Sequence, residues 1–385
     1  MEPRIAVTGL GMVSSLGHDI VSSCAAARAG ISRARELDYF KVKREDNGEV
    51  ESVLGHPAHA LTFGFEGFSR LVALAWPAFE NLLSDSALRD LNPGRTGLYL
   101  ALPDFERVNT GFDLVIDDRT RERLTKREKA SPPSPETHPY GMRLCQKLTE
   151  LAGLRIPSAH WSQTYGGHCG TTLAFRQAFR DLCDGKIDYA VLGGVDSLVE
   201  EETLQWFYDT GRLKTGDQPA GVQPGEAAAF VFLELEKTAR RRKAKLRATI
   251  LATAVGSEEN ELLAGKPTDG LGLSETIAAL FSELPRNDAP PPWIMTDQNG
   301  EPYRAYEWGY AVARLSSQAG RVRDAALYYP AIAFGDTGAA SGAVSLCVAA
   351  RAFSRGYAMS REVLVISSSD NHDRAAIFLA DSSPT

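Results

Sequence analysis

A glycine turn, a helix and a strand follow one another twice in this sequence, and this repeat constrains the fold more than any other feature. In the first copy, Gly166 and Gly167 precede a segment whose apolar residues return at the spacing of one helical face. We expect this helix to begin at or just after Cys169 and to end at Gly185. The apolar run 189–192 then predicts a short buried strand.

The second copy lies near the end of the chain. Gly335 and Gly338 lead into a segment that is small or apolar on every side, which is typical of a helix buried between layers. The run 362–366 follows as a strand. Two such units indicate a duplicated α/β domain whose buried helices face each other across a pseudo-twofold axis. We place the two halves at 1–245 and 246–385.

One stretch of the first half does not follow this pattern. Residues from about 104 to 138 contain the charged run DDRTRERLTKREK and a proline cluster. Charge runs of this kind are usually solvated, and proline clusters break regular structure. We therefore expect a surface insertion and not a site.

Composition excludes several classes of function. Of 385 residues, 42 are Lys or Arg and 49 are Asp or Glu, which gives a net charge of −7 and no basic field for nucleic acid or anionic membrane. No apolar run approaches the roughly 20 residues of a membrane span. Five cysteines without CxxC spacing argue against a metal site or a disulfide framework. We therefore expect a cytoplasmic protein.

Cys169 is the first candidate for chemistry. A thiol at a helix N-terminus is close to the positive end of the backbone dipole, which can lower its pKa and make it a nucleophile. The alternative is a small apolar residue that packs the start of the helix. The sequence leaves both interpretations open.

Four segments resemble the β-ketoacyl synthases, and their order and spacing agree over nearly the whole chain. They are IAVTGLGMVSSLG at 5–17, DGKIDYAVLGGVDS at 184–197, GVQPGEAAAFVFLELEKTARRRKAK at 221–245 and GDTGAASGAVSL at 335–346. The resemblance implies the thiolase fold, an α/β fold with duplicated βαβαβ halves in five α-β-α-β-α layers. It also implies a homodimer, or a heterodimer with another synthase.

The resemblance further implies a protein that acts on acyl thioesters. The acyl donor would be acyl carrier protein or acyl-CoA. Phosphopantetheine would arrive on that donor, so we expect no bound cofactor and no metal. The basic run Arg240 to Lys245 could contact the acidic helix of a carrier protein.

The catalytic positions of the family are not matched here. The family's nucleophile lies in a T-A-C-x-S-G turn; counting back from Ala174 puts His168 on the cysteine, whereas a shift by one residue restores Cys169. Two catalytic histidines are also expected in the second half. Asp297 or Asn299 occupies the first of these positions, and Asp336 the second. Ionised aspartates carry the wrong charge to stabilise a developing oxyanion, so we do not expect standard decarboxylative condensation.

Simpler acyl transfer needs only a thiol, a base and amide donors. Cys169 would supply the thiol, and His168 or His372 the base. Asn299 and Asp297 would orient substrate or water, unless they only form the turn D-Q-N-G. Asp336 is either part of the site or an N-cap of the buried helix. His372, between two aspartates, is either a base or a turn residue.

A second hypothesis belongs to a different class. The family includes chain-length-factor-like subunits that have lost the cysteine and act by pairing with an active synthase. Loss of both histidines fits such a non-catalytic partner. A third reading, a dinucleotide-binding protein, depends on the glycines at 9 and 11 and is set aside, because the third glycine of the fingerprint is missing.

Overall fold

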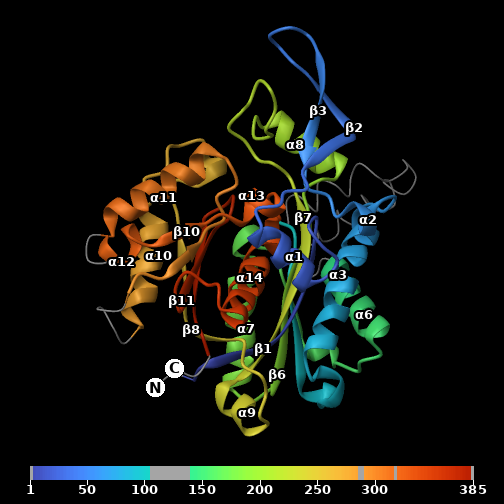
Figure 1. The fold of residues 1–385 in the computed structure, drawn as a ribbon, viewed down its shortest axis with the longest axis vertical. Helices are drawn as coiled ribbons and strands as arrows, with labels where there is room; N and C mark the ends of the chain where they lie inside the picture. Colours follow the sequence, from blue (N-terminus) through green and yellow to red (C-terminus); the bar gives the residue numbers. More distant parts are fainter. Residues whose placement is uncertain (1–2, 105–138, 285–289, 316–318, 383–385) are drawn as a thin grey trace, which may run out of the picture.

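The computed structural model describes residues 3–104, 139–284, 290–315 and 319–382 (Figure 1). The surface insertion predicted at about 104–138 lies outside this part of the chain, apart from Asp104. Among the described residues, no helix combines the length and the apolar character needed to cross a bilayer.

A ten-stranded sheet is built from two sets of strands. The first set is β1 (Ile5–Ser14), β4 (Thr96–Ala101), β5 (Trp161–Thr164), β6 (Tyr189–Ser197) and β7 (Glu226–Leu235). The second set is β8 (Ala248–Ser257), β9 (Trp293–Met295), β10 (Ala326–Tyr328), β11 (Glu362–Ser368) and β12 (Asp373–Ala380). The strand order is β10-β9-β11-β12-β8-β1-β7-β6-β4-β5.

The two sets repeat the same topology. Counted outward from the centre, each set runs first strand, fifth, fourth, second, third. In each, the first and fourth strands are antiparallel to the fifth, and the second is parallel to the fourth and the third. The sets join through β1 and β8, which pair only at Ile5–Val7 and Ala248–Ile250. The predicted duplication is confirmed; the division at 245/246 stays a prediction, with β8 opening the second set.

The helices complete the layers seen in Figure 1. Between the two sets of strands lie α7 (Gly170–Cys183) and α14 (Ser341–Arg355). The outer face of the first set is covered by α3 (Gly67–Asp85) and α6 (Pro139–Ala152). The outer face of the second is covered by α10 (Leu271–Ser282), α11 (Pro302–Arg314) and α12 (Ala319–Arg323). The arrangement is α-β-α-β-α, as the thiolase fold requires.

Shorter elements extend from these layers. The remaining helices are α1 (Ile20–Arg28), α2 (His59–Thr62), α8 (Glu201–Asp209), α9 (Glu236–Arg241) and α13 (Pro330–Phe334). A separate two-stranded sheet, β2 (Arg35–Lys43) with β3 (Val50–Gly55), projects beside α8 at the top of Figure 1.

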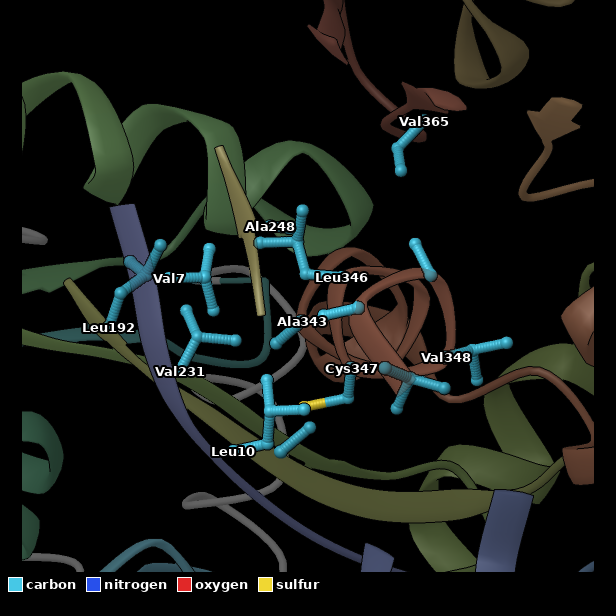
Figure 2. Packing of buried hydrophobic residues seen from close by; sticks show 14 of the residues in the cluster. Val7, Leu10, Leu192, Val231, Ala248, Ala343, Leu346, Cys347, Val348 and Val365 are labelled. Carbon is cyan, nitrogen blue, oxygen red and sulfur yellow. The ribbon is translucent and has the colours of Figure 1, made fainter. Parts of the chain in front are cut away.

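The central helices begin and end where the sequence predicts. α7 starts at Gly170 and stops before Gly185, whose φ is 68°. α14 consists mainly of small and apolar residues and ends at Gly356 in the left-handed conformation. Gly342 lets the two helices approach closely, because a Cβ there would lie 2.7 Å from Thr171 Cβ. Figure 2 shows Ala343, Leu346 and Cys347 of α14 packed among residues of the first set of strands.

Candidate functional site

Two tight turns, one from each half, pack against each other where the central helices begin. The first is the 3-10 turn Gly167–Cys169 before α7, and the second is Gly338–Ala340 before α14. Each starts with a glycine whose φ is 50°. This conformation is readily available only to glycine. The duplicated fold thus relates Gly167 to Gly338, and it places His168 and Cys169 at the centre of the molecule.

A hydrogen bond between His168 of the first half and Asp336 of the second half joins the two halves. Its Nε2 lies 2.8 Å from Asp336 Oδ1, although the two residues are 168 positions apart. The other oxygen of Asp336 accepts from Asn299 Nδ2 at 2.6 Å, and Oδ1 also accepts from the Gly338 amide at 2.8 Å. Asp336 is therefore part of the candidate site and also caps the turn before α14. It is not the N-cap of α14 itself, because the cap position of that helix is Ala340.

The charges of this pair stabilise each other. Burial acts to raise the pKa of Asp336, but His168 and Arg304 outweigh it and hold that pKa far below its ordinary value. Burial acts to lower the pKa of His168, but the Asp336 carboxylate outweighs it and the pKa of His168 is raised. A carboxylate at this position is thus ionised, and its role is to hold His168.

Arg304, on the first turns of α11, lies on the other side of the imidazole. Its Nη2 is 3.3 Å from His168 Nδ1 and donates to Asp370 Oδ1 at 2.9 Å. Its Nη1 donates to Asp297 Oδ2 at 2.9 Å and to the Ser368 carbonyl. A guanidinium only donates, so the contact with His168 is a hydrogen bond while Nδ1 carries no proton. The neutral imidazole then has its proton on Nε2, toward Asp336.

A second arginine extends the network. Arg212 donates to Glu301 Oε1 at 2.7 Å and to Asp370 Oδ2 at 2.8 Å, and Glu301 accepts from Asn299 at 2.9 Å. Burial acts to raise the pKa of Asp370, but Arg212 and Arg304 outweigh it and bring that pKa to about 2. Buried ion pairs of this kind are stable only when their remaining donors and acceptors are largely satisfied. The site is filled by protein charges that are paired with one another.

The expectation of a low pKa for Cys169 is wrong. The thiol is fully buried, and its Sγ lies 3.3 Å from the carbonyl oxygens of both Ser367 and Asp373, so its single proton can be donated to either. Burial raises the pKa of this thiol well above its ordinary value, and the charge of Asp297 raises it further. The proximity of the helix N-terminus does not offset removal of the thiolate from water. The packing interpretation describes Cys169 better than the nucleophile interpretation.

His372 is not brought to the other candidates. Its side chain is 62% exposed, and its nearest carboxylates are Asp373 at 3.7 Å and Glu261 at 4.0 Å. Of the two interpretations of His372, the structure supports the turn residue, here between β11 and β12. A base role for His372 toward Cys169 has no geometric support, because the imidazole faces solvent while the thiol faces two carbonyls.

The cavity beside these residues is small. Its volume is about 10 Å³, and it is lined in part by His168, Asp297, Asp336 and Ser341. This is the room for about one water molecule. Ser341 Oγ is buried without a hydrogen-bond partner in the structure, so a water there would have a polar contact. An acyl chain does not fit in this space as the side chains now stand.

The predicted docking run lies at the other end of the sheet. β7 starts at Glu226, beside the Gly225 amide that donates to Asp336, and α9 follows its last residue. Ten residues of strand separate these points by roughly 30 Å. Two arginines of the run are also ion-paired, Arg240 with Glu236 and Arg242 with Glu234. The run Arg240 to Lys245 is therefore not placed to guide a carrier protein to this site.

Sequence reasoning missed Arg212, Glu301 and Arg304, and it treated Asp370 only as a neighbour of His372. The available signal was the charge in E-P-Y-R directly after the turn D-Q-N-G, where a buried strand ends. Asp297, Asn299 and Asp336 were found because a resemblance gave their positions. Within the described ranges, no group of three or more His, Cys, Asp or Glu side chains is arranged to hold a metal ion.

Comparison with known proteins gives three relevant similarities. A Schizosaccharomyces pombe protein named as a mitochondrial 3-oxoacyl-[acyl-carrier-protein] synthase is 25% identical over 301 residues, which cover 69% of this chain and 66% of that protein. A ketosynthase of a type II polyketide synthase, solved with its acyl carrier protein, superposes with a TM-score of 0.76 at 15% identity over the full length of both chains. The ishigamide ketosynthase/chain length factor gives 0.73 at 18% identity, also over full length. No family model matches the chain.

This chain has the ketosynthase fold. The resemblance to β-ketoacyl synthases inferred from the sequence is confirmed. Within this ketosynthase fold, the meeting point of the two halves holds His168, Asp336 and the Arg304 network.

The His168–Asp336 ion pair leads to a prediction about pH dependence. A histidine whose pKa is higher in the folded protein stabilises the fold fully below its unfolded pKa of about 6.5, and this contribution is lost as the pH rises through the folded pKa. We expect the ring resonances of His168 to titrate above pH 6.5, and Asp336→Asn to bring that midpoint down. Proton NMR of the protein and of a His168→Gln assignment control measures this. A midpoint below 6.5 contradicts the prediction.

Proposed function

We propose that this chain is a non-catalytic, chain-length-factor-like subunit that pairs with an active β-ketoacyl synthase. The observation that carries the proposal is the state of Cys169, a fully buried thiol that faces two carbonyl oxygens beside a site filled by ion pairs. A thiol in this state cannot readily form the thiolate that attacks a thioester. Acyl transfer through Cys169 is the alternative, and it requires the network to open first.

The sheet offers a place for pairing. β5 is the last strand of the ten-stranded sheet and, among the described residues, it pairs only with β4. All four of its residues are half-buried. An edge strand with open backbone groups is a template for pairing with another chain. A ketosynthase-fold partner that adds its own edge strand would extend the sheet through the N-terminal half. Acyl carrier protein would then be a ligand of the pair.

Cysteine alkylation separates the two functions. Cys183 is exposed, whereas Cys24, Cys145, Cys169 and Cys347 are buried. We expect iodoacetamide to label only Cys183 in the native protein, and Cys183→Ser to remove nearly all native labelling. Peptide mapping by mass spectrometry measures the sites. Fast, selective labelling of Cys169 contradicts the proposal and favours the acyl-transfer alternative.

Acyl loading and pairing test the proposal directly. After incubation with acyl carrier protein thioesters, we expect no acyl group on the Cys169 peptide. Native mass spectrometry of a mixture with an active synthase from the same source should show a mixed complex. A covalent acyl group on Cys169, or condensation by this chain alone, would falsify the proposal.

A further inference from the structure

A cleft of about 310 Å³ lies between α1 and the last turns of α14. Three arginines line it, Arg28 from α1 and Arg351 and Arg355 from α14, together with Tyr357 just after that helix. The rest of its lining is apolar: Val21, Cys24, Ala25 and Ala29. Neither the network around His168 nor the edge strand β5 contributes to it.

The positive charge of this cleft is not neutralised. Over the described ranges, none of its three guanidiniums forms an ion pair, in contrast to Arg212 and Arg304 at the site. The guanidinium carbon of Arg28 lies 4.5 Å from the centre of the Tyr357 ring. Stacking uses the face of a guanidinium and leaves its N–H edges free to donate. All three arginines act electrostatically on Tyr357, so their charges converge there.

The helix ends account for only part of this arrangement. The C-terminal end of a helix carries partial negative charge and favours a cation. Arg28 and Arg355 are the last residues of α1 and α14, so this effect explains them. Arg351 is one turn earlier and half-buried in the cleft wall. A third unpaired cation at this position is repelled by the other two guanidiniums unless an anion binds between them.

We propose that this cleft binds a small phosphate-bearing ligand with an apolar portion. Guanidinium groups match phosphate oxygens with two parallel hydrogen bonds, and three of them suit a doubly charged or larger anion. The volume lies at the lower end of the range for small-molecule sites. The wall of Val21, Cys24 and Ala25 would cover the apolar portion.

Two further observations support this ligand class. Burial raises the pKa of Tyr357 to about 12, so its hydroxyl stays protonated near pH 7 and can donate a hydrogen bond. Burial likewise raises the pKa of Cys24 to about 12, so the thiol belongs to the apolar wall and is not a nucleophile. Arg351 lies ten residues along α14 from Ser341, roughly 15 Å from the start of that helix. The cleft is therefore separate from the His168–Asp336 pair.

Calorimetric titration at low salt tests the proposal with three probes: inorganic pyrophosphate, n-hexyl phosphate and citrate. We expect pyrophosphate and hexyl phosphate to bind, and citrate to bind at least tenfold more weakly than pyrophosphate. Arg351→Gln should weaken both phosphates by roughly tenfold or more, because a charge-assisted contact is lost. Arg323→Gln is the matched control, since the pairing that this exposed arginine makes among the described residues is with its neighbour Asp324.

The outcomes separate a built site from general attraction. A second variant, which combines Arg28→Gln with Arg355→Gln, tests the same cleft in case Arg351→Gln disturbs folding locally. Thermal denaturation checks that both variants are folded. Absence of phosphate binding overturns the proposal. Equal weakening by Arg323→Gln, or citrate binding as tight as pyrophosphate, also overturns it, because either result shows attraction without a phosphate site.

Discussion

Replacing Arg304 with methionine should lower the free energy of unfolding by about 3–5 kcal/mol, the usual loss when one partner of a buried charge network is removed. The side chain of Arg304 is 2% exposed and contacts Asp297, Asp370 and the ring of His168. Methionine has a similar length and helix propensity, so the loss of unfolding free energy measures the effect of removing the charged group. The carboxylates left behind would lose the guanidinium that compensates for their burial.

Arg314→Met is the control on the same helix. Arg314 ends α11 and pairs with Asp269, and the two side chains are 44% and 46% exposed. An exposed pair contributes about 1 kcal/mol or less. Urea denaturation of the two variants measures the difference. Equal losses would contradict the view that the network around His168 is a structural core.

Alanine at Gly338 should be far more destabilising than alanine at Gly167, although the two glycines occupy equivalent turns. Both have a φ of 50°, so both changes incur the same backbone strain, about 1 kcal/mol or more. A Cβ at Gly338 would lie 2.2 Å from Asp196 Oδ2, which accepts from the Ala339 amide. A Cβ at Gly167 would have its nearest neighbour, Asp104 Oδ2, at 3.8 Å.

We therefore expect a loss of about 1 kcal/mol for Gly167→Ala and about 3 kcal/mol or more for Gly338→Ala, since overpacking adds to strain. Thermal and urea denaturation of the pair measure the difference. Similar losses of unfolding free energy at both positions would contradict this prediction. They would mean that the turn at Gly338 can move away from Asp196 at little cost. The comparison isolates the contact, because the backbone conformation is shared.

Much of the fold was readable from the sequence. The glycine stops at Gly185 and Gly356, the small residues of α14 and the repeated strand runs all act locally, so their spacing predicts two buried helices and a duplicated sheet. The expectation that the family's two histidines are missing also came from the sequence, because it concerns which residue types are present; it stays a prediction. The strand β6 runs on to Ser197, beyond the predicted 192, because its antiparallel pairing with β7 continues past Gly193 and Gly194.

The sequence by itself determined the repeat, which follows from hydrophobic periodicity and turn residues, and it carried the four segments whose resemblance to β-ketoacyl synthases implied the layers. Only the tertiary structure decided the state of the site. The partners of His168 and Cys169 come from Asp336, Arg304, Ser367 and Asp373, between 136 and 204 positions away. A thiol's pKa depends on burial and nearby charge, and these are set by packing between the halves and not by its place at a helix start.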